Sequence, residues 1–359
     1  MEEWVKNKFK EFYKKHTVLA TNVDKREFGI GNLKKKIFRR HMAFVDEKDL
    51  KLFLEKEGPL YISHSVAYYK KPSATPMEAK GWEGADLVFD LDAEKADRDS
   101  INNIKGDLIN LIDLINDYLG AKDTLLVFSG NRGFHLHIRD RKFRKLGSEE
   151  RRKLILFLKG EKFNHKKLFD IYNKYNLNED IILGPKPTDK GFGGLFAKMV
   201  IEELNKNPQK IHRYFKDKIA RERFIEGIKE GNWGKYDRRK VKNLFDKINY
   251  VLNNIKIFSL SIDSGVTQDI TKLIRVPGSL HGSTGFWVMP IKEDRIEEFD
   301  PFYDPVVFSS EKVKIRMKSS VKVEIKEFKA LLKKDEIVEV PEYVAIYLIL
   351  KGHSFLLYG

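Results

Sequence analysis

The chain has 359 residues and contains no cysteine. This absence excludes disulfide bonds, thiolate catalysis and any zinc or iron–sulfur site that cysteine would hold. The chain also lacks a run of about eighteen apolar residues, so no segment is expected to span a membrane. Its first residues, MEEWVKNKFKEFYKKH, lack the apolar region of a signal peptide and predict an amphipathic helix, which favours a cytoplasmic location.

Acidic residues are the scarcer charged class. The 53 Asp and Glu residues stand against 68 Lys and Arg residues, which gives a formal net charge of +15. A basic surface of this size favours a polyanionic partner such as nucleic acid. A composition rich in Lys and Glu is also typical of proteins from hot environments, so charge alone leaves both interpretations open.

The alternation of apolar and polar residues predicts the organisation of the chain. Strands are expected at 85–92, 124–129, 134–139, 257–263 and 285–291. Amphipathic helices dominate the middle of the chain. A further helix is predicted for the run IKEFKALLKK near the end, which is followed by an apolar stretch that is either core or docking surface.

These patterns predict an α/β (α+β) fold in three parts. Residues 1–145 and 256–320 are expected to form one discontinuous α/β domain. Residues 146–255 are expected to form a helical subdomain inserted into it, and residues 321–359 a C-terminal segment.

Two aspartates end the predicted strand at 85–92. Asp90 and Asp92 are two positions apart, so a strand places both carboxylates on one face, about 7 Å apart. Carboxylates at the end of a strand are well placed to hold one or two divalent cations, and Mg²⁺ prefers a few carboxylates together with water and phosphate oxygens. The Asp-x-Asp pattern also occurs in sugar transferases and in plain turns, so the pair alone leaves these alternatives open.

The segment SGNRGFH lies between two predicted strands. Its two glycines allow backbone amides to approach an anion closely, and Ser129, Arg132 and His135 supply further donors for a phosphate. A simple hairpin turn fits the same segment. The His-x-His pattern that begins at His135 also fits a solvated strand face or a pair of zinc ligands, although no third ligand at close spacing supports zinc.

A second group of charged residues follows in the segment DSGVTQDITKLIRVPGSLH. Asp263 follows a strand-like run, whereas Asp269 fits a helix cap, and the run DITKLIR predicts a short helix. If Asp263 comes near the Asp-x-Asp pair, the site has the three carboxylates typical of metal-assisted phosphoryl transfer. If Arg275 and His281 reach the same cleft, they supply positive charge for a triphosphate.

Near the N-terminus, residues 25–41 (KREFGIGNLKKKIFRRH) contain a single acid, Glu27, among many Lys and Arg residues. One interpretation is a solvated strand pair whose charged edges deter aggregation. The other is an edge that contacts phosphates of a template or an incoming nucleotide. The one-sided charge favours the second.

In this order, LVFDLD, SGNRGFH and the segment from Asp263 to His281 resemble the three signature motifs of the archaeo-eukaryotic primase superfamily. KREFGIG, RRHMAF and FDPFYDPVV are similar to segments of its replicative small subunits. The resemblance runs from about residue 20 to about residue 310 and points to the catalytic small subunit of an archaeal or eukaryotic-type DNA primase. It implies a primase-type catalytic domain with mixed or antiparallel sheets and an inserted helical subdomain.

The resemblance also implies roles for single residues. Asp90, Asp92 and Asp263 match the catalytic carboxylates that hold two Mg²⁺ or Mn²⁺ ions. The residues that match nucleotide-binding positions are Ser129, Arg132, His135, Arg275, His281, Arg40 and Glu27. Arg39 competes with Arg40 for its position, because the spacing from Glu27 requires a one-residue insertion.

The implied activity is the synthesis of short primers on a single-stranded DNA template from nucleoside triphosphates during replication, in a heterodimer with a large primase subunit. Small subunits of this family usually carry a Cys/His zinc knuckle shortly after the first motif. This chain continues there into a predicted helix and has no cysteine, so no zinc knuckle is expected. Two alternatives remain: a repair or plasmid polymerase of the same superfamily, and a non-catalytic nucleic-acid-binding module.

Overall fold

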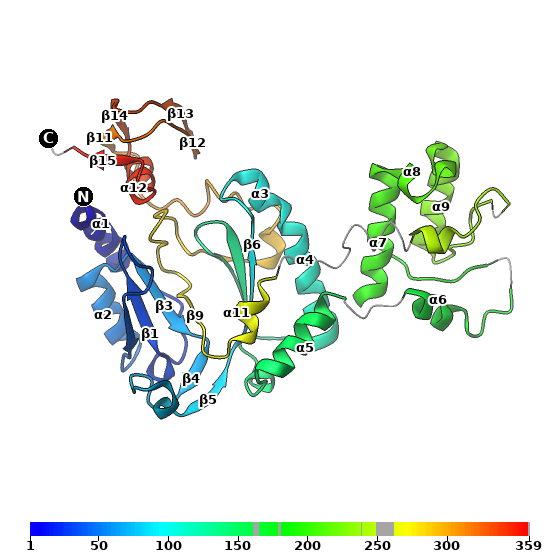
Figure 1. Ribbon diagram of the computed structural model, residues 1–359, viewed down its shortest axis with the longest axis horizontal. Coiled ribbons are helices and arrows are strands. Elements are labelled where there is room, and N and C mark those ends of the chain that lie inside the picture. The colour runs from blue at the N-terminus through cyan, green and yellow to red at the C-terminus, as the bar shows by residue number, and fades with distance from the viewer. Residues whose placement is uncertain (161–164, 179–180, 238, 249–261, 358–359) are drawn as a thin grey trace. The chain divides into compact units, whose positions relative to one another are not determined.

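In the computed structural model the chain forms two compact units (Figure 1). The structure describes residues 1–160, 165–178, 181–237, 239–248 and 262–357. The first unit, here the mixed unit, comprises Met1–Leu108, Lys122–Arg152 and Ser261–Gly359, and the second, here the helical unit, comprises Ile109–Ala121 and Lys153–Leu260. Helices and several sheets occur together, and the strand pairs given below are antiparallel, so the predicted α+β fold is confirmed.

Residues 321–359, expected to form a segment of their own, belong to the mixed unit together with residues 1–108. Residues 109–121 belong to the helical unit, although they precede the expected insertion in the sequence. In the described parts of the chain, no helix is long and apolar enough to cross a bilayer.

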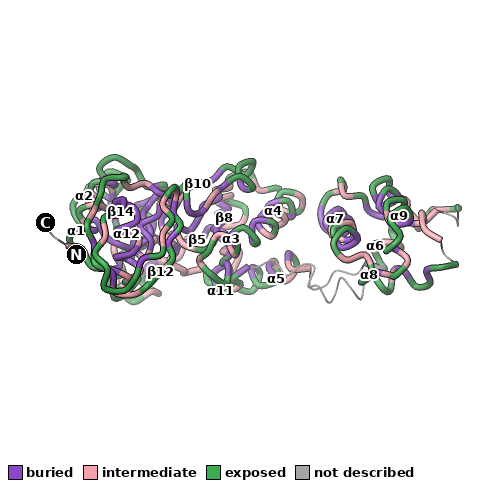
Figure 2. The backbone as a smooth tube through the Cα atoms, turned by 90° about the horizontal axis from the view of Figure 1, so that it is seen from above, coloured by how far each residue is buried: buried purple, intermediate pink, exposed green. Residues whose placement is uncertain are grey.

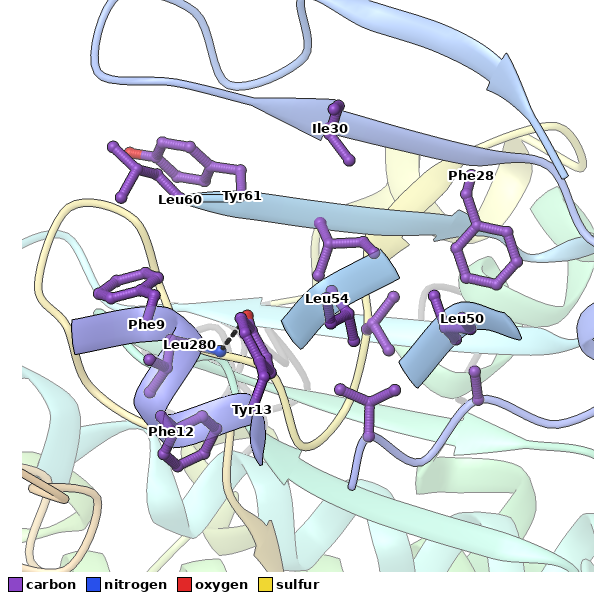
Figure 3. Close-up of a cluster of buried hydrophobic side chains, with 14 of the residues drawn as sticks. Phe9, Phe12, Tyr13, Phe28, Ile30, Leu50, Leu54, Leu60, Tyr61 and Leu280 are labelled. Carbon is purple, nitrogen blue, oxygen red and sulfur yellow. Dashed lines mark hydrogen bonds between the residues drawn. The ribbon is translucent and has the colours of Figure 1, made fainter. Parts of the chain in front are cut away.

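The first sheet has the strand order β2-β1-β3-β9. Its strands are β1 (Phe28–Gly31), β2 (Arg39–Met42), β3 (Tyr61–Ser65) and β9 (Leu273–Arg275). Helices α1 (Glu2–Lys15) and α2 (Glu47–Glu57) pack on it through one hydrophobic core (Figure 3). The Asp46 carboxylate caps the start of α2 by accepting from two backbone amides, and Gly58 ends this helix in the left-handed conformation.

The second sheet has the strand order β10-β7-β8-β6 and carries the first two motifs. Its strands are β6 (Leu87–Asp92), β7 (Thr124–Phe128), β8 (Gly133–Ile138) and β10 (Pro290–Ile291). In the register of β6 and β8, Asp90 lies opposite His135 and Asp92 lies opposite Gly133. This pairing brings the predicted carboxylates beside the predicted phosphate-binding turn.

The C-terminal part of the mixed unit adds a third sheet in the order β14-β11-β15. Its strands are β11 (Lys312–Met317), β14 (Ile337–Pro341) and β15 (Ser354–Leu356). Helix α12 (Glu342–Leu350) packs against all three strands and is buried along nearly its whole length (Figure 2). The apolar stretch near the C-terminus is therefore core.

Shorter elements complete the mixed unit. Two antiparallel hairpins join β4 (Ala67–Tyr69) to β5 (Trp82–Ala85) and β12 (Val321–Ile325) to β13 (Phe328–Leu332). The other elements are α3 (Arg98–Asn103), α11 (Ser264–Gln268), η1 (Val23–Lys25), η2 (Met77–Lys80), η4 (Arg141–Phe143) and η6 (Glu293–Arg295). Helices α4 (Lys105–Leu114) and α5 (Ser148–Leu158) begin in the mixed unit and end in the helical unit.

The helical unit packs around Trp233, whose side chain is fully buried. Its other described elements are the π-helix η3 (Ile115–Leu119), α6 (His165–Asn173), α7 (Gly191–Lys206), α8 (Pro208–Ile211), η5 (Arg213–Lys216) and α9 (Lys218–Glu230). The unit has its own hydrophobic core, which includes Phe196 of α7 and Phe224 of α9.

Two predicted helices are wrong. In the run DITKLIR the last three residues form strand β9, because they pair with β3 (Ser63 opposite Arg275), and the residues before them are loop and turn. The run IKEFKALLKK forms most of the β12–β13 hairpin, which turns at Lys326 in the left-handed conformation (φ 49°). In both places pairing with another strand overrides a local helical pattern. Most of the strand expected at 257–263 lies outside the described residues.

Candidate active site

A cavity of about 530 Å³ opens in the mixed unit where the first and second sheets meet α11. It is lined by every residue predicted for the site except Glu27 and Arg40. The lining residues are Lys36, Ile37, Tyr61, Ser63, Asp90, Asp92, Ser129, Asn131, Arg132, His135, Asp263, Val266, Lys272, Leu273, Ile274, Arg275 and His281. Segments that are far apart in the sequence thus contribute to one cavity.

Three carboxylates come together on one side of this cavity. Asp90 and Asp92 lie on β6, and the backbone amide of Asp263 donates a hydrogen bond to the carbonyl of Asp90 (2.8 Å). A bridge between Leu91 and Ile262 extends this antiparallel contact. Asp263 also caps α11, because its carboxylate accepts from the amide of Gly265 (2.8 Å).

The Asp90 carboxyl has a strongly raised pKa. Burial, followed by the negative charges of Asp92 and Asp263, raises its pKa from 3.8 to about 7, against the opposing effect of Arg275. Its Oδ1 atom is buried and has no hydrogen-bond partner. A buried carboxylate oxygen without a partner is ready to accept a cation or a proton.

The carboxylates of Asp90, Asp92 and Asp263 fit a hard divalent cation, although they do not surround it completely. Among the residues that the structure describes, no group of three or more His, Asp or Glu side chains is arranged to hold a metal ion by itself. Asp92 accepts two hydrogen bonds from Arg132 (3.2 and 3.3 Å), so part of its capacity is used by the protein. Mg²⁺ and related ions retain several waters and take substrate phosphate oxygens, so an open set of carboxylates suits them.

The turn between β7 and β8 is tightly built. The Ser129 amide donates to the carbonyl of Gly133 (2.8 Å), and the Gly133 amide donates to the Ser129 hydroxyl oxygen (3.2 Å). Gly130 has a positive φ of 81°, and a Cβ atom there would lie 2.7 Å from the Cβ of His281. A glycine is therefore required, and the turn is packed directly on the loop that carries His281.

His135 is buried on β8 beside the carboxylates. Its Nε2 lies 3.6 Å from Oδ1 of Asp90, and burial, with a smaller effect of Arg275, lowers its pKa to about 3. This imidazole is therefore neutral at physiological pH. His137 is buried as well, so neither histidine belongs to a solvated strand face.

Arg275, on β9 of the first sheet, and His281, in the loop that follows β9, also line the cavity. Arg275 donates from Nη1 to the carbonyl of Ser129 (3.3 Å), and its position on β9 follows from the pairing with β3. His281 is buried, which together with the charge of Arg275 lowers its pKa far below the usual value. Its Nδ1 accepts from the backbone amide of Ser283 (3.1 Å). The Nε2 atom is then the protonated nitrogen of the neutral ring and a donor.

The loop before His281 is hydrogen-bonded to the N-terminal helix α1. Tyr13 is buried in the core on α1, and its hydroxyl accepts a hydrogen bond from the backbone amide of Leu280 (3.2 Å; Figure 3). Burial raises the pKa of this hydroxyl, so it stays protonated. An α1 side chain therefore fixes the backbone next to a residue of the cavity.

Glu27 and Arg40 form a separate arrangement. Glu27 is fully buried and accepts from Nε of Arg40 (2.9 Å), with Lys80 at 3.6 Å on its other oxygen. Of the two competing arginines, Arg40 is thus the partner of Glu27. This buried carboxylate is therefore hydrogen-bonded to β2, and neither Glu27 nor Arg40 lines the cavity.

Several lining residues were missed by the sequence analysis. Lys36 lies in the basic N-terminal segment, whose lysine run was the available signal, and Lys272 lies in the segment of the third motif. Tyr61 and Asn131 gave no signal of their own. Lys351 donates from Nζ to the side-chain oxygen of Asn131 (3.2 Å), so the end of α12 also supports the β7–β8 turn.

Comparison with known proteins gives the family. The family model described as DNA primase small subunit matches residues 89–293. The DNA primase small subunit PriS of Methanococcoides burtonii is 32% identical over 97% of this chain and 97% of the relative. That of Archaeoglobus fulgidus is 31% identical, with 98% and 97% covered.

Among solved structures, the polymerase domain of ligase D from Mycobacterium tuberculosis in complex with DNA gives a TM-score of 0.40 at 12% identity, with 84% of each chain covered. The family match spans more than half of the chain and runs from Phe89, within the first motif, to beyond His281. The resemblance read from the motifs is confirmed: this chain is a nucleotidyltransferase that belongs to the DNA primase small-subunit family.

Proposed function

We propose that this chain synthesises short primers on single-stranded DNA from nucleoside triphosphates, by nucleotidyl transfer at the cavity that contains Asp90, Asp92 and Asp263. The observation that carries the proposal is the meeting of three carboxylates and several basic side chains from distant segments in one cavity. Negative groups that attract cations beside positive groups that attract phosphates are what the transfer of a nucleotidyl group requires.

The three carboxylates would hold two Mg²⁺ or Mn²⁺ ions, which activate the primer 3′-hydroxyl and stabilise the pyrophosphate oxygens when bound. Arg275 and Arg132 supply fixed positive charge for the triphosphate. His281, neutral and buried, offers the N–H of Nε2 to a phosphate oxygen, while the Ser283 amide that donates to Nδ1 fixes its ring. The chain needs no covalent nucleophile, because its residues orient the substrate and neutralise the charge that shifts to the leaving group.

Ser129 and His135 have different roles in this proposal. The Ser129 hydroxyl oxygen accepts from Gly133, so its own proton is available to a phosphate oxygen. His135 lies beside Asp90. Because its ring is neutral, it leaves the negative charge of the carboxylate available for a cation. Glu27 contributes by holding Arg40 on β2, toward the template or the nucleotide.

The name of the relatives, small subunit, supports a heterodimer with a large primase subunit that promotes initiation during replication. The absence of cysteine supports the part of the proposal that no Cys/His zinc knuckle accompanies the site.

The double variant D90A/D92A tests the proposal on unprimed single-stranded DNA with nucleoside triphosphates and Mg²⁺ or Mn²⁺. Primer synthesis should fall to background, whereas DNA binding, which consists mainly of phosphate contacts, should remain. The matched control E297A/E298A removes two neighbouring exposed acids from the same unit and should synthesise primers at the wild-type rate. Wild-type synthesis by D90A/D92A would refute the assignment.

The alternative of a repair or plasmid polymerase shares the same cavity. De novo synthesis on an unprimed template, measured with and without a large subunit, separates the two functions. A chain that only extends existing primers under both conditions fits the alternative.

A further inference from the structure

The C-terminal sheet has one covered face and one open face. On the central strand β11, Ile315 and Met317 are buried on the side of α12, whereas Lys312, Lys314 and Arg316 are exposed on the opposite side. Alternate residues of a strand lie about 7 Å apart on one face. The open face therefore carries a straight row of three cations.

Apolar side chains flank this row. In the register of the sheet, Arg316 lies between Ile337 on β14 and Phe355 on β15. Ile337 is 54% exposed and Phe355 is 49% exposed. Lys318, which continues the row, places its Nζ 3.7 Å from the centre of the Phe355 ring. We call these six residues (Lys312, Lys314, Arg316, Lys318, Ile337 and Phe355) the open sheet face.

The positive charge of the open sheet face is not neutralised within the chain. Among the residues that the structure describes, no carboxylate lies within 4.0 Å of the charged nitrogens of its Lys and Arg residues. Glu339, opposite Lys314, is one acid on the same side of the sheet, and against the four cations of this face it leaves the net charge positive. On the neighbouring β12–β13 hairpin, by contrast, Lys329 pairs with Glu324 (3.0 Å).

A row of unpaired cations beside an exposed aromatic ring fits a ligand with regularly spaced phosphates and flat bases. Proteins that bind single strands combine a basic track for the backbone with aromatic rings on which bases stack. A protein partner would need carboxylates at the spacing of this row to neutralise it, whereas every nucleic-acid strand carries regularly spaced phosphates. The charge therefore favours nucleic acid.

We propose that the open sheet face binds single-stranded nucleic acid, with phosphates on Lys312, Lys314 and Arg316 and a base stacked on Phe355. The proposal rests on the proposed function only in taking single-stranded DNA template as the strand that is bound. This site is separate from the catalytic cavity, whose lining residues it does not share.

Fluorescence anisotropy with a labelled single-stranded DNA tests the row of cations, in chelator and without nucleotide. The variant K312Q/K314Q/R316Q should bind roughly 10- to 100-fold more weakly at 0.1 M salt, and the slope of log affinity against log salt should fall by about 2. The control K14Q/K48Q/K56Q removes the same charge from exposed lysines of α1 and α2 and should change both quantities little. Equal losses in the two variants would overturn the proposal, because net charge alone would explain them.

Phe355 provides an independent test of the site. F355A should weaken binding by roughly 5- to 150-fold, the range for one lost base stack, and F355Y should restore it. F355W should show quenched indole emission when DNA binds, against the background of the chain's four tryptophans. Unquenched emission from F355W, or wild-type DNA binding by both F355A and K312Q/K314Q/R316Q, would overturn the proposal. If these variants also lost the capture of a large subunit, the face would be assigned to protein docking instead.

These outcomes are distinguishable from failure of the proposed function. The D90A/D92A variant should bind DNA through the open sheet face as tightly as wild type. A chain that binds DNA through this face but makes no primers would refute the proposed function alone. A chain that makes primers, and whose DNA affinity is unchanged by substitutions on the open sheet face, would refute this inference alone.

Discussion

The backbone amide of Asp263 donates a hydrogen bond to the backbone carbonyl of Asp90 at 2.8 Å. This contact brings the third motif to the end of β6 and places its carboxylate close enough to perturb the Asp90 side chain. The position of the carboxylates thus depends on main-chain pairing between two segments. Their mutual repulsion lowers the stability of the folded chain.

The raised pKa of Asp90 predicts a pH-dependent stability. Below about pH 4 the carboxyl is protonated in both states, so it has no effect. Between pH 4 and 7 the unfolded chain releases this proton while the folded chain keeps it, so stability falls as pH rises, and the full penalty persists above pH 7. At about 1.4 kcal/mol per pKa unit, a rise from 3.8 to about 7 corresponds to a penalty of roughly 4 kcal/mol.

In chelator, D90N should therefore unfold at higher denaturant concentration than wild type at pH 8 and show no such gain at pH 4. D92N should give a smaller pH-dependent gain, because burial is a larger cause of the raised pKa than the charge of Asp92. Urea unfolding at both pH values measures the differences. A D90N gain that is equal at pH 4 and pH 8 would contradict the assigned pKa.

Tyr13 should support the His281 loop through its hydroxyl. Y13F leaves the buried amide of Leu280 without a partner, which should cost about 1–3 kcal/mol of unfolding free energy. The control is Y69F, because the buried hydroxyl of Tyr69 has no hydrogen-bond partner and its removal should be neutral or stabilising. Chemical denaturation of both variants measures the contrast, and equal effects would show that the Leu280 contact adds nothing.

Gly130 should resist substitution more strongly than another glycine of similar conformation. G130A combines a positive φ of 81° with a clash against His281 at 2.7 Å, whereas G352A has a φ of 79° and nothing within 4 Å. G352A should cost only the backbone strain, about 1 kcal/mol, while G130A should cost more and also reduce nucleotide incorporation. Thermal unfolding and a primer-extension assay test this, and matching losses in both variants would argue against the packed turn.

The buried ion pair between Arg26 and Asp86 should be essential for stability. Arg26 donates to Asp86 at 2.5 Å, and both side chains are almost completely buried. R26A removes the closest cation of a buried carboxylate and leaves only Arg144, whose Nε lies 3.9 Å from Asp86, so it should destabilise the chain by about 3–5 kcal/mol. The control K329A breaks the exposed pair with Glu324 and should cost less than about 1 kcal/mol. Denaturant midpoints of the two variants test the difference; similar small losses would show that Asp86 finds other donors.

The sequence by itself determined the local features of this protein. The alternation in LVFDLD fixed Asp90 and Asp92 on one face of a strand, because strand geometry repeats every two residues. The positions of the glycines in SGNRGFH predicted a tight turn, which Ser129 and Gly133 close with two hydrogen bonds. The order of the three motifs indicated the family, because the order of residues along the chain does not depend on how the chain folds.

Tertiary structure alone decided which distant segments meet. Asp263 joins the carboxylates through main-chain pairing with β6, and Arg275 enters the cavity because its segment pairs with β3 instead of forming the predicted helix. Likewise the run from Ile325 to Lys334 became part of a hairpin. A local pattern specifies the period of a segment but not its partner, and strand pairing and burial are energies that arise only between segments brought together by folding.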